Sequence, residues 1–438
     1  MNVTGRRKNR GESGASGPRV GLFGLLAAGN IGNDASMEAL LGYLKESYPD
    51  AVIDAMTSGA EQMQAVYGIP AIPLHWHQKY EERSWGGRAR QGAAWRAAAG
   101  QAARSGAVTS LRKALGLGLG LGIDAFRTAA WVRRHDVVIV PGAGVLETSV
   151  HMRPWEDPYT MFLLCASGRL SGTKVALVGV GASALNQRAI RWLFTAGARL
   201  AYYRSYRDAK SRDAMRRNGV NTASDHVYCD LVFGFPPGAY QAGAPDTVGV
   251  GVLAYYGSND ERDQADQLNV AYLTAMKSFV RWLVDNGRKV RLFVGDTNGS
   301  DESVVRELLA DIAAYRPDLS PEQVTASSAD SWAVLAREMA PVSTVVAARY
   351  HNVLCALKLA KPAIAIGYSG KHQTLMSAMG MPEFCLQANA LTAEGLIGMF
   401  KELDGDATRL RQVISERNDA NAQLAREQFA ELTKVLFS

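Results

Sequence analysis

Three basic side chains and one histidine are placed along the chain where they could bind and protonate a small acidic molecule. Arg207 precedes a helical pattern, Arg349 and His351 follow an apolar strand, and Lys371 follows another strand. Arginine binds carboxylates and phosphates through its planar fork of N–H donors, and histidine exchanges protons near neutral pH. Because the carboxyl ends of parallel strands meet at one edge of a sheet, we expect these side chains to share a site.

A glycine-containing loop is the second candidate for binding an anion. It lies between the first apolar strand and the first helical pattern, and its residues are Gly29, Asn30, Ile31, Gly32 and Asn33. Glycines let backbone N–H groups approach a ligand closely, and the N-terminus of a helix attracts negative charge. We expect Asp34 to cap the helix that follows. A tight turn without a ligand is the alternative.

Two further side chains complete the candidate binding set. Tyr368 follows the same strand as Lys371, and His151 follows a strand and a glycine loop at residues 137–144. The four cysteines are isolated from one another and from histidines, which argues against disulfides and structural zinc and favours a reducing, cytoplasmic compartment. The sequence therefore gives no reason to expect a metal or a cofactor.

Apolar strands alternate with helical patterns along most of the chain, which is typical of parallel sheets covered on both faces. The sequence predicts an α/β protein with two Rossmann-like domains facing a cleft, at residues 20–235 and 247–390, joined by a Pro- and Gly-rich linker at residues 236–246. A disordered basic tail, residues 1–19, precedes them. Helices in residues 391–438 are expected to pack back on the first domain.

Individual strands and helices follow from the same patterns. In the first domain, buried strands are predicted, among other places, at residues 200–203 and 227–232, and a helix at residues 188–197. In the second domain, the strands before the Arg349 and Lys371 motifs are predicted at residues 344–347 and 363–366.

The stretch 79–134 departs from this alternation. It carries eleven Lys and Arg residues against three acidic ones, and three tryptophans lie among them. A solvated helical flank of the first domain is one interpretation, and peripheral contact with an anionic membrane at the inner face is the other. No apolar run is long enough to span a bilayer. The net charge of +6 comes from this stretch and the amino-terminal tail, so the chain does not have the overall charge of a nucleic-acid-binding protein.

Four short motifs, in this order, resemble those of the polysaccharide pyruvyltransferase family. They are G-N-x-G from Gly29, R-D-x-x-S from Arg207, R-x-H from Arg349, and K-P followed by Y-x-x-K, which ends at Lys371. The resemblance covers residues 20–386. It implies a fold like that of two-domain GT-B glycosyltransferases, phosphoenolpyruvate as donor substrate, and a sugar of an exopolysaccharide or lipid-linked glycan as acceptor.

The resemblance also implies roles for single residues. Arg207, Arg349 and His351 would bind the donor or take part in catalysis, with Lys371 and the glycine loop lining the cleft. His351 would then transfer the proton that activates the donor. The sequence departs from the family where Asn33 replaces the more usual Asp, and where Gly142-Ala143-Gly144 replaces three glycines.

Three other functions fit parts of the sequence. A GT-B glycosyltransferase using a nucleotide sugar would share the fold and its phosphate-binding loops. A nicotinamide-dependent oxidoreductase is suggested by a G-x-G-x-x-A match at residues 179–184, although the next strand lacks the acidic residue that this fingerprint requires. A family member that has lost catalysis and serves as a binding protein is the third.

Overall fold

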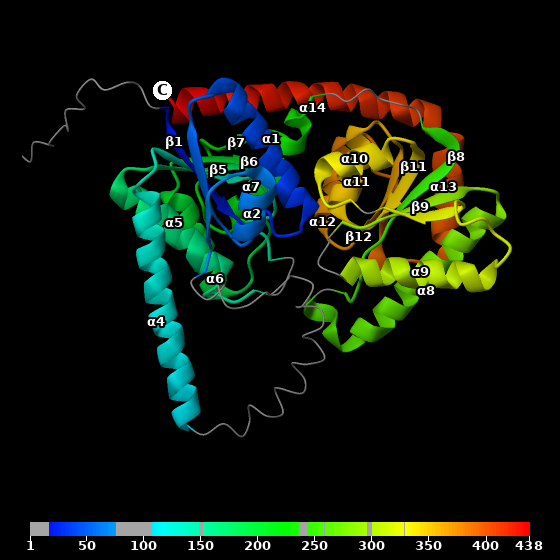
Figure 1. Ribbon diagram of the computed structural model, residues 1–438, viewed down its shortest axis with the longest axis horizontal. Helices are drawn as coiled ribbons and strands as arrows, with labels where there is room; N and C mark the ends of the chain where they lie inside the picture. The colour runs from blue at the N-terminus through cyan, green and yellow to red at the C-terminus, as the bar shows by residue number, and fades with distance from the viewer. Residues whose placement is uncertain are drawn as a thin grey trace, which may run out of the picture.

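The computed structural model describes residues 17–75, 107–148, 152–236, 243–257, 259–295, 300–327 and 329–438. Within these residues two parallel sheets form two α/β domains that lie side by side, and one long helix runs along both of them (Figure 1). The prediction of an α/β protein with two Rossmann-like domains is confirmed.

The first domain is built on a parallel sheet in the order β3-β2-β1-β4-β5-β6-β7. Its central strands are nearly continuous runs of Val, Ile and Leu, as expected for strands covered by helices on both faces. The strands are β1 (Arg19–Gly24), β2 (Val52–Thr57), β3 (Ala71–Pro73), β4 (Val137–Pro141), β5 (Lys174–Val180), β6 (Tyr203–Tyr206) and β7 (His226–Val227). The helices are α1 (Ile31–Ser47), α2 (Ala60–Tyr67), α4 (Ala107–Val132), α5 (Asp157–Ser171), α6 (Arg188–Leu200), α7 (Ala209–Arg217) and the short 3-10 helix η2 (Leu231–Gly234).

The second domain repeats the arrangement with the order β10-β9-β8-β11-β12-β13. Its strands are β8 (Ala244–Gly251), β9 (Lys289–Phe293), β10 (Val324–Ala326), β11 (Val342–Ala347), β12 (Ala363–Gly367) and β13 (Cys385–Gln387). Its helices are η3 (Asn259–Gln264), α8 (Ala265–Asp285), α9 (Ser300–Tyr315), α10 (Trp332–Met339), α11 (Tyr350–Lys358), α12 (Gly370–Ala378), η4 (Ala388–Ala390) and α13 (Ala393–Gly405).

Each sheet reverses its strand order beside its first strand. β1 pairs with β2 on one side and β4 on the other, and β8 pairs with β9 and β11 in the same way. Open α/β sheets bind ligands outside the carboxyl ends of the strands at such a reversal. The glycine loop follows β1 and Arg349 follows β11, so each candidate motif lies at the reversal of its own sheet.

Helix α14 (Ala407–Leu436) joins the two domains along one side (Figure 1). Its 30 residues span about 45 Å at the usual rise of an α-helix. Asn418 Nδ2 donates to the carbonyl oxygen of Leu357 in the second domain at 2.8 Å. The ring of Phe429 stacks on that of Tyr43 in the first domain, with 4.6 Å between the ring centres. The prediction that the C-terminal helix packs back on the first domain is confirmed.

Two predicted strands were wrong. Residues 200–203 do not form one strand, because α6 continues through Leu200 with Phe194 and Ala198 buried, and β6 begins only at Tyr203. As a result Arg207 directly follows the end of β6.

The second wrong strand covers residues 227–232. Within this range only Val227 belongs to a strand, the end of β7. The side chain of Asp230 accepts a hydrogen bond from the backbone N–H of Val232 at 3.2 Å and starts the 3-10 helix η2.

The boundaries of the linker and of the basic insertion also differ from the predicted ones. Strand β8 begins inside the predicted linker, because the N–H of Ala244 pairs with the carbonyl of Pro341 at 2.8 Å.

The carboxyl-terminal part of the predicted insertion forms α4, which extends away from the first domain (Figure 1), while residues 79–106 lie outside the described residues. Of the helices that the structure describes, none has the length and apolar character to cross a membrane.

Candidate active site

Helix α1 is capped by Asn30, in the loop after β1, and not by Asp34. Asn30 Oδ1 accepts hydrogen bonds from the backbone N–H groups of Gly32 at 3.1 Å and Asn33 at 3.3 Å, so α1 begins at Ile31. The predicted cap was wrong. Asn30 and Asp34 are both suitable caps by residue type, but Asn30 has the extended backbone that an N-cap requires. The second glycine of the motif therefore lies in the first turn of a helix.

The side chains that follow the cap hold the loop in place. Asn33 Nδ2 donates to the carbonyl of Leu25 at 3.2 Å, and Asp34 Oδ1 accepts from the N–H of Ala27 at 2.6 Å. Ala27 has a φ of 51°, a strained value for a residue with a side chain. Burial raises the pKa of Asp34 to about 7, although the bond from Ala27 opposes the shift. Asp34 is thus a buried carboxyl group that braces a strained turn.

His351 of the second domain packs directly on Gly32 of the first. A Cβ atom on Gly32 would lie 1.8 Å from His351 Nδ1 and 1.9 Å from its Cγ, so a residue with a side chain does not fit there. His351 Nε2 is enclosed and has no hydrogen-bond partner among the described residues. The imidazole is therefore held at the domain interface with its Nε2 unpaired within the described part of the chain.

The electrostatic environment of His351 favours its neutral form. Burial lowers its pKa well below the ordinary value, and the positive charges of Lys371, Arg207 and Arg349 lower it further. The neighbouring ring of His372 acts in the same direction. All three cations predicted from the sequence, which follow β6, β11 and β12, therefore act on one imidazole. In this state His351 is neutral, and it would hold a proton only if negative charge offset the nearby cations.

Glu147 links cations of the two domains. Its Oε1 lies 2.6 Å from Nη2 of Arg207, and its Oε2 lies 3.7 Å from Nζ of Lys371. Burial alone would raise the pKa of this carboxyl group, but Lys371 and Arg207 outweigh it and hold the pKa below its usual value. In this cluster of three side chains, Arg207 and Glu147 are nearly enclosed, at 6% and 8% exposed, and the side chain of Lys371 is 20% exposed.

Two tyrosine rings support this cluster. The guanidinium of Arg207 lies 4.9 Å from the ring centre of Tyr350, and the ammonium of Lys371 lies 5.6 Å from the same ring and 5.4 Å from that of Tyr368. A cation over an aromatic face is attracted to it, more so when water is excluded. Tyr350 therefore lies beside the two cations from different domains.

Arg349 is held in a different way. Its Nε and Nη2 contact the two oxygens of Asp301 at 2.7 and 2.8 Å, a two-point ion pair. Asp301 is fully buried and also accepts a bond from the N–H of Ala254 at 3.1 Å. A Cβ atom on Gly295 would lie 2.7 Å from Arg349 Cγ, so this glycine makes room for the arginine. The orientation of the guanidinium is thus fixed within the second domain.

The structure brings most of the predicted residues together. Around the domain interface it gathers Gly32, Arg207, His351, Tyr368 and Lys371, with Arg349 beside them. The side-chain contacts described above for Asn30 and Asn33 lie within their own loop, whose Gly29 adopts a φ of 81°. His151 lies outside the described residues, so its prediction stays open.

Sequence reasoning missed the carboxylates and the central ring. Glu147 and Asp301 were not identified, although Glu147 follows a glycine loop at a strand end, which is a usable signal. Tyr350 stands inside the Arg349 motif but was not assigned to the site. Their partners come from distant segments, which periodicity does not reveal.

The G-x-G-x-x-A match does not form a dinucleotide fingerprint here. In that fingerprint a helix opens at the glycines, whereas α6 begins only at Arg188. A Cβ atom on Gly181 would lie 2.5 Å from Glu147 Oε1 and 2.7 Å from Arg207 Nη2, so this glycine serves the ionic cluster. Within the described ranges, no group of three or more His, Cys, Asp or Glu side chains is arranged to hold a metal ion.

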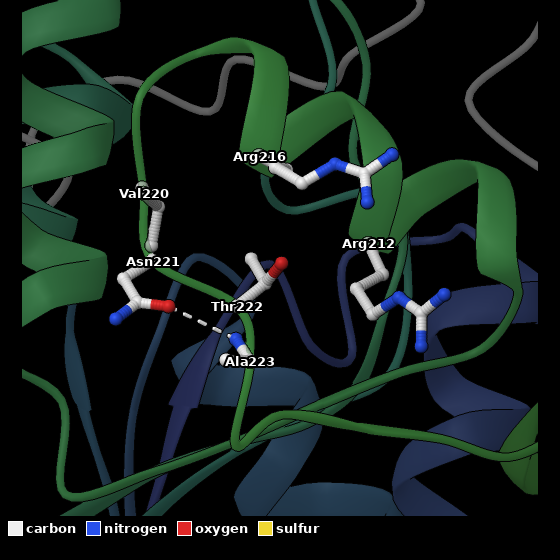
Figure 2. Close-up of a pocket in the computed structure, with 6 residues that line it drawn as sticks. All are labelled: Arg212, Arg216, Val220, Asn221, Thr222 and Ala223. Carbon is white, nitrogen blue, oxygen red and sulfur yellow. Dashed lines mark hydrogen bonds between the residues drawn. The ribbon is translucent and has the colours of Figure 1, made fainter.

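A shallow cavity of about 330 Å³ lies elsewhere on the first domain (Figure 2). Arg212 and Arg216 of α7 line it together with the loop of residues 220–223. Arg216 is paired with Asp213 at 3.3 Å. None of the cluster residues lines this cavity, so it is separate from the candidate active site.

Comparison with known proteins identifies a family and a similar fold. A family model described as polysaccharide pyruvyl transferase matches residues 30–370. A search among curated proteins gives no significant match. Two solved structures are similar at 10% identity, covering 95% of this chain and 99% of theirs: Anabaena HepE in complex with UDP (TM-score 0.55) and the Neisseria meningitidis UDP-GlcNAc 2-epimerase bound to UDP-GlcNAc (TM-score 0.56). At this identity the similarity shows the GT-B-like fold alone.

Proposed function

The chain belongs to the polysaccharide pyruvyl transferase family, and we propose that it moves a pyruvyl group from phosphoenolpyruvate onto a sugar of a polysaccharide or glycolipid as a ketal. The observation that carries the proposal is the meeting of Arg207 and Lys371, from different domains, beside the available nitrogen of His351. A small acidic donor needs cations that converge on it, and this locus supplies them.

The donor carries a carboxylate and a phosphate on a three-carbon frame. Arg207 and Lys371 would bind its acidic groups, and Arg349 would add a fixed positive charge from the second domain. Because Arg207 and Glu147 are nearly enclosed, the two domains must separate for the donor to enter. Helix α14 contacts both domains and would connect them during this movement.

The reaction balances without a co-reactant. A proton adds to the methylene carbon of the donor, which becomes a methyl group and leaves positive charge on the neighbouring carbon. One sugar hydroxyl attacks that carbon, and a second displaces phosphate and closes the ketal ring. One of the two released hydroxyl protons restores the catalytic acid and the other leaves with phosphate.

His351 is the proposed proton carrier. In the free protein its pKa is low because of burial and the surrounding cations. Bound donor would offset the charges of Lys371 and Arg207 and so allow His351 to hold a proton beside the methylene carbon. Proton transfer of this kind contributes about 10²–10⁴ in rate.

The proposal is tested by incubating the protein with phosphoenolpyruvate and a panel of free and lipid-linked glycosides, followed by mass spectrometry. Ketal-modified product is expected from the wild type, and His351→Gln should lose turnover while still binding donor. His226→Gln, at an exposed position, is the matched control. Unchanged turnover in His351→Gln would remove the assignment, and no product with any acceptor would contradict the function.

A nucleotide-sugar glycosyltransferase is the second candidate. It is supported by the similar folds of HepE, solved with UDP, and of the epimerase bound to UDP-GlcNAc. A ligand stabilises the protein that binds it. Thermal-shift measurements with phosphoenolpyruvate and with UDP-sugars should therefore separate the two candidates, and we expect phosphoenolpyruvate to give the larger shift.

A lipid-linked acceptor would place the reaction at the inner face of a membrane, in the cytoplasm. Peripheral contact through α4 would suit this placement, and it is supported by Leu119 and Phe126, which are 67% and 73% exposed. Flotation with anionic liposomes at low salt tests the contact. Phe126→Ser should reduce binding, and the absence of wild-type binding would remove this part of the proposal.

A further inference from the structure

The carboxylate of Glu147 lies in surroundings of the kind that proteins build for anionic ligands. A Cβ atom on Gly144 would lie 2.6 Å from Oε2, and one on Gly181 would lie 2.5 Å from Oε1. Backbone without side chains therefore closes around the carboxylate from the loops after β4 and β5. Close backbone approach of this sort is a common use of glycine beside an anionic group.

The carboxylate is held in this position by opposite charges, because each of its two oxygens faces a cation of a different domain. Oε1 contacts Arg207 of the first domain, and Oε2 faces Lys371 of the second. A free carboxylate placed between these two cations would make the same contacts. The position is therefore one that an acidic group of a substrate could occupy.

Protein carboxylates already face the cations of the cluster. Arg207 also faces two other carboxylates, with its Nε 3.7 Å from Asp208 and its Nη1 3.8 Å from Asp230. Arg349 is already paired with Asp301. Protein carboxylates thus compensate the cations closely, and a donor with about three negative charges would bring uncompensated charge into an enclosed site, which is costly.

We propose that the carboxylate of Glu147 is an internal substitute for an acidic group of the donor, which occupies the position between Arg207 and Lys371 until the donor displaces it. The inference rests on the proposed function, since the donor considered is phosphoenolpyruvate. Separation of the domains breaks the contact between Glu147 and Lys371. Glu147 then turns away, and the donor makes the bridge in its place.

The test compares the Kd of phosphoenolpyruvate for the wild type, Glu147→Gln and Glu147→Ala by isothermal titration calorimetry. Removing the competing charge should tighten binding about tenfold in both variants. Glu338→Gln is the matched control, because Glu338 is also paired with an arginine, Arg291 at 3.3 Å, but lies in α10 outside the cluster. Its Kd should equal that of the wild type. Equal or weaker binding by both Glu147 variants overturns the proposal.

A second measurement follows the stability of Glu147→Ala instead of its affinity for the donor. Glu147→Ala should be stabilised by millimolar formate or acetate, which restores a carboxylate between the two cations, whereas the wild type should show no such shift. A lack of any formate or acetate effect in Glu147→Ala also overturns the proposal. Failure of the proposed function is distinguished separately, because it would appear as absence of ketal product from the wild type.

Discussion

A side chain at position 32 would collide with His351, since a Cβ there would lie 1.8 Å from the imidazole Nδ1. Gly32 belongs to the first domain and His351 to the second, so the glycine of the β1–α1 loop and the proposed proton carrier fit each other across the interface. The loop therefore acts through the histidine that it admits, since the N–H groups of Gly32 and Asn33 already donate to Asn30.

Gly32→Ala should lower turnover about 10²-fold or more, because a displacement of about 1 Å at a reacting group has that effect. The change is measured as kcat in the ketal-forming assay. Gly42→Ala is the matched control in the same helix, because a Cβ there meets nothing within 4 Å. It should leave kcat unchanged and stabilise the protein by about 0.5–1 kcal/mol. Full activity in Gly32→Ala would contradict the described contact.

The pH dependence of kcat and kcat/KM should differ. The pKa of His351 lies well below its ordinary value in the free protein because of burial and then Lys371, so its protonated fraction, and with it kcat/KM, falls as pH rises. Bound donor supplies negative charge and raises that pKa, so the decline in kcat should occur at higher pH. Superimposed profiles would show that His351 does not carry the proton.

Arg349→Lys should destabilise the protein by about 2 kcal/mol, because a lysine cannot form the two-point contact with the buried Asp301. Urea unfolding measures the change. Arg281→Lys is a suitable comparison, since Arg281 makes the same two-point contact with Asp311 at a more exposed position. It should cost less than about 1 kcal/mol. Equal effects in the two variants would argue against a fixed role for Arg349.

Asp34→Asn should become more stable than the wild type as pH rises. The pKa of Asp34 is about 7 when folded, chiefly through burial, against an ordinary value of 3.8. Between these values the folded protein binds more protons than the unfolded chain, so this group costs stability as pH rises from about 4 to about 7. The advantage of the variant should grow over that range by about 2–4 kcal/mol and then level off.

Urea unfolding across this pH range measures the effect. Asp50→Asn removes a charge from an exposed position of the same domain and should show no such trend. An advantage of Asp34→Asn that does not change with pH would show that Asp34 ionises normally.

The sequence predicted the fold and the residues that follow strand ends. Alternation of apolar strands with helices is a local pattern, and it placed Arg207, Arg349 and Lys371 at one edge of their sheets. The contact of Glu147 with Arg207 and Lys371 was not predicted, because it joins loops of two domains that no local pattern relates. The helix cap was assigned to Asp34 instead of Asn30 because two suitable residues lie four positions apart, and backbone geometry decides between them.

The central claim is that cations from both domains bind one molecule of phosphoenolpyruvate. Isothermal titration calorimetry with the wild type, Arg207→Gln and Lys371→Gln tests it most directly. We expect one site per chain in the wild type and a Kd at least about tenfold weaker in each variant, because each removes a charge-assisted contact from a different domain. No binding by the wild type, or an unchanged Kd in either variant, would contradict the account.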